Sequence, residues 1–398
     1  MLKKIIKINI ITSILLSNMA MAADCSSDPI DPRGSVVQLK ESLQQASNTG
    51  KPLRIAGTYY INSDIQVFLK KDLSVDATGA NFIATSELDG DMFSFDSNST
   101  KSTECNSADI KANFSWNGGS FNMAQAKVST VVPQTSKTPQ GREGTKATAD
   151  ALSIRGVDQN GASKLNELLI ENIQFTGTTN PTDPFYLAGG DSGILMTGAL
   201  KATIRNNAFY GVRDAAIYVS AGGNNGVFGD HFTLSNNYVE RAYDGITSKR
   251  GADNIKMLNN IMEDVVVGLS TKMVYSGWTA TNIIIKGNEV TRAVRAISVE
   301  RSNNVTIEDN QILELGGTVA NQDNPINPFG QQYEGISLNG IQGTNYVRYN
   351  HIVGLGDSRV STADTYGLIT RDYDGRSTTG LIKSGNVYAN IDKIVKQF

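Results

Sequence analysis

The segment TLSNNYV, residues 233–239, decides the fold because close variants of it recur along the chain. Each variant has an apolar residue, then a dipeptide that ends in Asn, then an apolar residue two positions after the Asn. The other variants are TIRNNAF (203–209), KMLNNIM (256–262), IIKGNEV (284–290), TIEDNQI (306–312) and YVRYNHI (346–352). Repeats at intervals of roughly 22 to 40 residues, without helical patterns between them, predict a stacked solenoid of short strands.

The repeated asparagine explains how such coils would be joined. The column comprises Asn207, Asn237, Asn260, Asn288, Asn310 and Asn350, with Asn386 as its expected last member. Asn tolerates a left-handed backbone, and its amide can hydrogen-bond the Asn of the next coil to form a ladder. The alternating apolar positions would form a continuous interior. The sequence therefore predicts an all-β fold.

A helical segment precedes the first coils. SVVQLKESLQQASNTGK, residues 35–51, has apolar residues at helical spacing up to Gly50. We predict a capping helix over 35–50, because an open solenoid end exposes the core and unpaired strand edges. The following KPLRIAGTYYINSDIQV and LSVDATGANFIAT segments predict the first short strands.

With this helix, the PLRIAGTYYI strand and the Asn corners, residues 35–390 resemble a known family. This family comprises the secreted right-handed parallel β-helix proteins of the pectate-lyase-like superfamily. The resemblance implies a right-handed parallel β-helix, but that fold hosts lyases, hydrolases, epimerases and adhesins alike.

The N-terminal residues predict export. MLKKIIKINIITSILLSNMAMAAD has three lysines, an apolar stretch and small residues, which is typical of a signal peptide over 1–22 cleaved after Ala22. We expect residues 23–398 to be a single secreted or periplasmic domain, monomeric and without a membrane anchor. In that oxidising environment Cys25 and Cys105 are expected to form a disulfide.

The charge and metal-ligand content exclude several functions. Removing the three signal-peptide lysines takes the net charge from −3 to about −6, which disfavours nucleic acid as a partner. Two cysteines and two histidines disfavour a zinc site, and we expect His231 and His351 to be structural.

A second repeated column predicts where the chemistry lies. Its members are SGILMT (192–197), AAIYVS (215–220), DGITSK (244–249), VGLSTK (267–272), RAISVE (295–300), EGISLN (334–339) and YGLITR (366–371). An inward Ile or Leu follows a Gly or Ala in each, and Thr or Ser comes next in the middle coils. We predict that the small and hydroxyl residues face outward as a groove floor. Charged side chains and the long polar loops 125–150, 176–191 and 316–334 would wall the groove.

This arrangement predicts an acidic polysaccharide as the partner. β-Elimination at a uronate needs a neutralised carboxylate and a base that removes the C5 proton. Resemblance to uronate-cleaving β-helix lyases implies Lys249 as the base and Lys272 as a second cation. Either Arg250 or Arg301 would neutralise the carboxylate. The expected substrate-binding residues are Asp244, Arg295, Glu300, Glu334, Asn339, Tyr366 and Arg371.

Calcium use and the reaction type stay open at this point. No cofactor is certain, but Asp244, Glu300 and Glu334 would hold Ca²⁺ or orient the cations. Cross-coil salt bridges are the structural alternative for all these charges.

A lyase that cleaves an acidic exopolysaccharide, such as capsule or biofilm matrix, is the favoured function. A glycoside hydrolase would pair Asp244 with Glu300 or Glu334, although the Asp-Asp and Gly-His-Gly signatures of the polygalacturonase-like hydrolases are absent. A non-catalytic adhesin would only bind the polymer. In all three, aromatic residues would stack on sugars: Tyr275, Trp278, Tyr333 and Tyr366.

Overall fold

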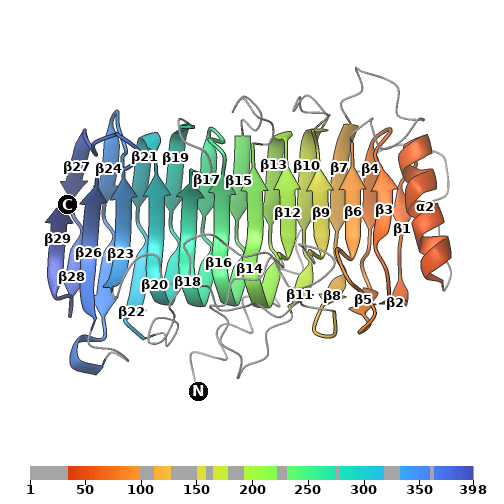
Figure 1. The fold of residues 1–398 in the computed structure, drawn as a ribbon, viewed down its shortest axis with the longest axis horizontal. Helices are drawn as coiled ribbons and strands as arrows, with labels where there is room; N and C mark the ends of the chain where they lie inside the picture. The colour runs from red at the N-terminus through yellow and green to blue at the C-terminus, as the bar shows by residue number, and fades with distance from the viewer. Residues whose placement is uncertain are drawn as a thin grey trace.

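The computed structural model describes residues 35–97, 112–126, 150–157, 165–177, 192–221, 231–273, 278–317, 332–358 and 363–397. The predicted signal peptide, both cysteines, Tyr275 and most of the three long loops lie outside the described residues. The described strands stack side by side along the long axis of the molecule, with helix α2 (Val36–Thr49) at one end (Figure 1). The ladders between these strands are parallel, so the molecule is a parallel β-helix, as predicted.

One sheet of eleven strands forms the first face, which we call face A. Its strands are β1 (Leu53–Arg54), β4 (Leu73–Asp76), β7 (Ala112–Asn117), β10 (Leu165–Glu171), β13 (Ala199–Arg205), β15 (His231–Ser235), β17 (Ile255–Leu258), β19 (Ala280–Lys286), β21 (Ser302–Glu308), β24 (Asn345–Arg348) and β27 (Leu381–Ser384).

A second sheet bends into two further faces, B and C. Face B contains β2 (Gly57–Ile61), β5 (Ala80–Ala84), β8 (Ser120–Asn122), β11 (Gln174–Thr176), β22 (Gln311–Leu315), β25 (His351–Gly354) and β28 (Val387–Ala389). Face C contains β3 (Ile65–Phe68), β6 (Phe93–Asp96), β9 (Leu152–Arg155), β12 (Ile194–Thr197), β23 (Gln332–Asn339), β26 (Asp364–Arg371) and β29 (Lys393–Gln397). Four long strands run through both faces: β14 (Ala208–Ser220), β16 (Tyr238–Lys249), β18 (Ile261–Lys272) and β20 (Glu289–Glu300).

The predicted asparagine ladder is present at the corner between faces A and B. Each Asn from Asn207 to Asn350 donates its side-chain N–H to the Oδ1 of the next Asn, at 2.9–3.0 Å, and the ladder ends at Asn386. The same Oδ1 also accepts the backbone N–H of the preceding Asn. These buried amides are therefore hydrogen-bonded along the solenoid.

The left-handed backbone at this corner belongs to the residue before each ladder Asn, which corrects our expectation. Asn236 has a φ of 55° and Gly287 a φ of 66°, whereas their neighbours Asn237 and Asn288 have no positive φ. The others in this position are Asn206, Asn259, Asp309, Tyr349 and Gly385. The ladder Asn is thus kept for its amide hydrogen bonds, and the preceding residue makes the turn.

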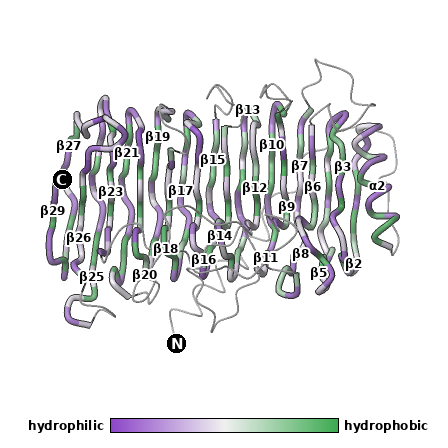
Figure 2. The backbone as a smooth tube through the Cα atoms, viewed as in Figure 1, coloured by the Kyte–Doolittle hydropathy of each residue, from purple (hydrophilic) through white to green (hydrophobic). Residues whose placement is uncertain are grey.

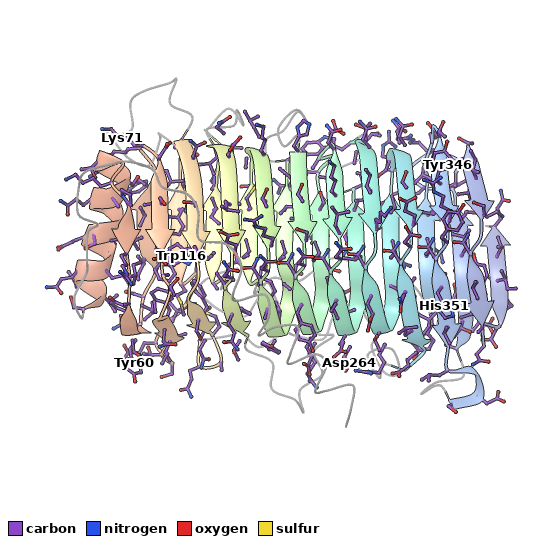
Figure 3. The ribbon with its side chains drawn as sticks, turned by 180° about the vertical axis from the view of Figure 1, so that it is seen from behind. Tyr60, Lys71, Trp116, Asp264, Tyr346 and His351 are labelled. Carbon is purple, nitrogen blue, oxygen red and sulfur yellow. The ribbon has the colours of Figure 1, made fainter. Side chains whose placement is uncertain are left out.

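The interior is a continuous apolar stack. Apolar residues recur along the strands of successive coils (Figure 2). Near the helical end the stack is aromatic, and the buried Trp116 has its ring centroid 5.4 Å from that of Phe93 and 5.8 Å from that of Phe121 (Figure 3). The later coils are filled mainly by aliphatic residues, with a few aromatic ones such as Phe232 and Tyr333. Such packing is the main stabilising contribution expected for a solenoid.

Helix α2 covers the edge of the first coil. The Ser35 hydroxyl accepts the N–H of Gln38 at 3.1 Å, and Gly50 ends the helix with a φ of 75°. The amide side chain of Gln44 bonds both the N–H and the C=O of Phe68, at 2.9 and 3.0 Å. The helix therefore satisfies backbone groups of β3 that would otherwise form an open edge. Among the described residues, no helix is both long and apolar enough to cross a membrane.

Candidate functional site

The outer surface of face C carries most of the residues that the sequence predicts as functional. One line of them follows the ends of adjacent strands, and we call it the outer row: Ser220, Lys249, Lys272, Glu300, Asn339 and Arg371. A second line lies at the corner where faces B and C meet, and we call it the corner row: Asp244, Val267, Arg295, Glu334 and Tyr366. The fold thus brings the predicted cations and acids together on one face.

The hydroxyl residues between these rows do not form an open floor. Thr247, Ser270, Ser298 and Ser337 are all 0% exposed. The Ser270 hydroxyl donates to Thr247 at 2.9 Å, and a guanidinium N–H of Arg371 donates to Ser337 at 2.9 Å. The predicted exposed floor is therefore wrong, and some of these hydroxyls serve as hydrogen-bond partners within the face.

The small residues of this column point inward, which also corrects our prediction. A Cβ on Gly245 would lie 2.7 Å from the buried Sδ of Met262 and 2.5 Å from the carbonyl oxygen of Gly268. Ala216 and Ala296, at equivalent positions, belong to the core. These residues are small because the chain bends there and the two faces approach closely.

Lys272 is held as a charged residue by a neighbouring acid. Its Nζ lies 2.7 Å from Oδ1 of Asp244, which is only 2% exposed. Burial alone would lower the pKa of Lys272, but the Asp244 carboxylate outweighs it and raises that pKa. Lys272 therefore stays cationic, and Asp244 serves as its counter-ion rather than as an opposite wall of a groove.

Lys249 has a different environment. Its Nζ lies 4.2 Å from the ring centroid of Tyr218, and within the described part of the chain it makes no ion pair with a carboxylate. Burial lowers the pKa of Lys249, and the positive charge of Lys272 lowers it further, which together outweigh the opposing effect of the Asp214 and Asp244 carboxylates. Two adjacent lysines on paired strands thus have opposite pKa shifts, which is typical of an acid–base site.

The second charged group is a carboxylate between two guanidinium groups. Glu334 pairs with Arg295 and with Arg371, in each case at 2.5 Å. Burial would raise the pKa of Glu334, but the two guanidinium groups lower it. Asn339 accepts an N–H of Arg371 at 3.5 Å and hydrogen-bonds Ser337. Glu334 is therefore ionised, and its carboxylate is paired with both arginines.

Glu300 lies between these two groups. Its Oε2 accepts the backbone N–H of Met273 at 3.2 Å. Burial and the nearby Glu300 carboxylate raise the pKa of Tyr373 to about 12. Burial raises the pKa of Glu300, and the charges of Lys272 and Arg295 only partly offset this. A small pocket is lined by Lys272, Trp278, Glu300 and Arg301, among others.

The two arginines proposed as carboxylate neutralisers lie at turns after the face C strands. Arg250 follows β16 with a φ of 63°. Arg301 follows β20, and its guanidinium pairs with the Asp374 carboxylate and donates to the Asp374 carbonyl at 2.8 Å. Arg301 is thus tied to a later turn of the chain.

Several predicted binding residues are unavailable for sugar stacking. Tyr366 is 1% exposed, and its hydroxyl donates to Asp364 at 3.0 Å. Tyr333 is fully buried in the core. Trp278 is partly exposed and lines the small pocket. His231 and His351 lie on β15 and β25, away from face C (Figure 3 for His351).

The three carboxylates proposed as calcium ligands do not form a metal site. Asp244 and Glu334 are engaged with cations, and Glu300 lies on β20 between them. In the described ranges, no group of three or more His, Cys, Asp or Glu side chains is arranged to hold a metal ion. Oxygen ligands for Ca²⁺ must converge, and these residues do not fit that requirement.

Three tyrosines of the site were not predicted. Tyr218 and Tyr243 flank Lys249 and Lys272, and Tyr373 reaches Glu300 from a later coil. Tyr218 is in the AAIYVS copy of the second column, at the position where the middle coils have Thr or Ser, so alignment of the repeats could have found it. No repeat signal marks Tyr373.

Comparisons with solved structures found several chains similar to this one. The A-module of the Azotobacter vinelandii mannuronan C-5 epimerase AlgE4 shares the fold with a TM-score of 0.51 and 13% identity, over 92% of this chain and 95% of that one. DFA-IIIase from Arthrobacter chlorophenolicus A6 is 13% identical over 92% of each chain, with a TM-score of 0.44. PfbA, a surface adhesin of Streptococcus pneumoniae, is 11% identical over 92% of this chain and 91% of that one, with a TM-score of 0.44.

A search of curated proteins found no match. The family model described as a right handed beta helix region matches residues 155–358, and the chain therefore belongs to the right-handed β-helix family.

Proposed function

We propose that this protein is an exported lyase that cleaves an acidic polysaccharide by β-elimination at a uronate. The observation that carries the proposal is the contrast between Lys249 and Lys272 on paired strands of face C. The amine of Lys249, with its lowered pKa, would remove the C5 proton. Lys272, which Asp244 keeps charged, would neutralise the uronate carboxylate and so make that proton more acidic.

Hydrolysis is less well supported by the same face. A hydrolase needs one carboxylic acid and one free carboxylate at a defined separation. Glu300 could supply the acid, but Asp244 is paired with Lys272 and Glu334 with two arginines. The adhesin alternative leaves the partly buried amine of Lys249 without a role, because removing from water an amine that makes no ion pair among the described residues costs stability.

The proposal predicts a product that can be observed directly. The purified protein is incubated with a panel of uronate polymers while the ultraviolet band of a 4,5-unsaturated uronate is followed. Growth of that band together with new reducing ends is the expected result. New ends without the band would assign hydrolysis, and binding without new ends would assign an adhesin. Inverted uronate configuration without new ends would assign epimerisation.

Replacement of Lys249 by Met tests the base. The variant should lose roughly 10²–10⁴-fold in kcat, because general base catalysis contributes about that factor. Its thermal stability should be unchanged or higher at neutral pH, because a lysine with a lowered folded pKa costs stability below that pKa. Lys256→Met, on exposed face A, is the matched control. Normal turnover by the Lys249 variant would remove Lys249 from the mechanism.

A further inference from the structure

The proposed elimination leaves one proton unassigned. When the C5 proton moves to Lys249 and the C4–O bond breaks, the departing oxygen needs a proton to leave as a hydroxyl. Because Lys272 is committed to the uronate carboxylate, another group must supply it. This inference rests on the proposed function and concerns that same site.

Glu300 is the carboxyl group in the best position for this step. It follows Lys272 in the outer row, so Lys249, Lys272 and Glu300 lie on three successive strands, with backbones roughly 10 Å apart from first to last. A uronate whose carboxylate lies over Lys272 would have Lys249 on one side and Glu300 on the other. Within the described residues Glu300 makes no ion pair, in contrast to Asp244 and Glu334.

A later turn of the chain lies near Glu300. Tyr373 and Arg376 exchange backbone hydrogen bonds of 2.9 and 3.0 Å across Asp374 and Gly375, which have φ values of 48° and 72°. These angles are those of the tight hairpin turn that Asp-Gly favours. The turn thereby places Tyr373 near enough to the Glu300 carboxylate for that carboxylate to help raise the pKa of Tyr373.

The turn is anchored to earlier corners of the solenoid. Arg376 donates to the Thr279 hydroxyl and to the Gln342 side chain, each at 2.9 Å, and also to the Asn303 side chain. Asp374 pairs with Arg301. Several hydrogen bonds and an ion pair therefore fix the turn that carries Tyr373.

We propose that Glu300 donates the proton to the leaving oxygen, and that Tyr373 is a positioning residue that orients the Glu300 carboxyl group. In the step, the Lys249 amine takes the C5 proton and the C5–H electron pair becomes the C4=C5 double bond. The C4–O bond electrons stay on the leaving oxygen, which takes the Glu300 proton. Transfer of one proton from the Lys249 ammonium to the Glu300 carboxylate through solvent restores both groups.

The groups around Glu300 determine whether its pKa is raised or lowered. Burial and the Asp244 carboxylate on β16 favour its protonated form, whereas Lys272 on β18, Arg295 on β20 and the N–H of Met273 favour the carboxylate. The nearby Tyr373 hydroxyl is a further polar group that would favour the carboxylate. Its removal should raise the Glu300 pKa and move the alkaline limb of kcat to higher pH.

The test compares leaving groups. Wild type, Glu300→Gln and Tyr373→Phe are assayed on a uronate polymer that the wild type cleaves and on a uronide with a 4-nitrophenoxy group at C4, which leaves without a proton. Glu300→Gln should lose roughly 10²-fold or more on the polymer and only a few-fold on the aryl substrate. Tyr373→Phe should keep most activity and shift the alkaline limb upward.

The outcomes separate this inference from the proposed function. Equal losses on both substrates would overturn the role of Glu300 while the unsaturated product still supports the lyase. Products without the unsaturated band would overturn the proposed lyase function. The comparison of the two leaving groups would still test whether Glu300 donates a proton. Independently of turnover, infrared titration should show a protonated carboxyl band above the usual glutamate range that Glu300→Gln removes. Absence of that band in the wild type would also overturn the inference.

Discussion

The asparagine ladder and the outer row both run along the solenoid, but they differ in how far they repeat. The ladder has the same residue with the same hydrogen bonds in coil after coil, from Asn207 to Asn386. In the outer row the residue changes at most steps, from Ser220 through lysines and Glu300 to Arg371. Exact repetition therefore builds the fold, and departure from repetition on face C provides the site.

The largest stability effect should come from breaking the charged network. In Glu334→Gln, Arg295 loses its carboxylate partner while it stays only 3% exposed. We expect a loss of about 3–5 kcal/mol in the free energy of unfolding, measured with urea at neutral pH, because an uncompensated buried charge is costly.

The pH dependence of that loss has a definite sign. Since the folded pKa of Glu334 is lowered, its contribution is present above the unfolded pKa and lost as pH falls through the folded value. The wild type and the variant should therefore converge in stability under acid conditions. A constant gap across the acidic range would contradict the ionised state of Glu334.

The ladder should be nearly as sensitive. Asn288→Ala removes hydrogen bonds to Asn260, Asn310 and the carbonyl of Met257, all within a buried corner. Each buried group left without a partner costs about 1–3 kcal/mol, so unfolding should become easier by at least that much. Asn386→Ala, at the less buried end of the ladder, is the control and should cost less. Equal losses would mean that the ladder does not stabilise its centre more than its end.

The smallest of these effects tests the inward direction of the small residues. A Cβ on Gly268 would lie 2.5 Å from the carbonyl oxygen of Ala296 and 3.0 Å from a methyl group of Val290. Gly268→Ala should therefore destabilise the protein by about 1–3 kcal/mol. Lys256→Ala, exposed on β17, should be near neutral in the same thermal unfolding measurement. If Gly268→Ala leaves the thermal stability unchanged, the conclusion that this position faces the interior would be wrong.

The sequence predicted the architecture well because the Asn column is a direct physical signal. Coils that stack must repeat their corner, and the ladder amides require the same side chain each time. Helix α2 was predicted within one residue at each end because its apolar residues have helical spacing and Gly50 is a strong C-terminal capping signal.

The error at Gly245 arose from strict alternation of side chains along a strand. The bend between faces B and C places two consecutive residues, Gly245 and Ile246, against buried side chains, and alternation resumes only afterwards. The two-residue alternation of side chains along a strand does not reveal such a bend in the sequence. The partner of Glu300 was equally hidden, because Tyr373 arrives from a turn more than seventy residues later in the chain.

Because helix α2 covers the first coil, the two ends of the described solenoid should differ in how easily they open. With Gln44 bonded to both backbone groups of Phe68, the first coil has hydrogen-bond partners on its outer side. In the last described coil, by contrast, Ile382, Val387 and Ile394 are about half exposed. Because each coil is stabilised mainly by its neighbours, amide hydrogen exchange should be slowest near α2 and in the central coils and fastest in β27–β29. Opening of the molecule then begins at the end farthest from the helix.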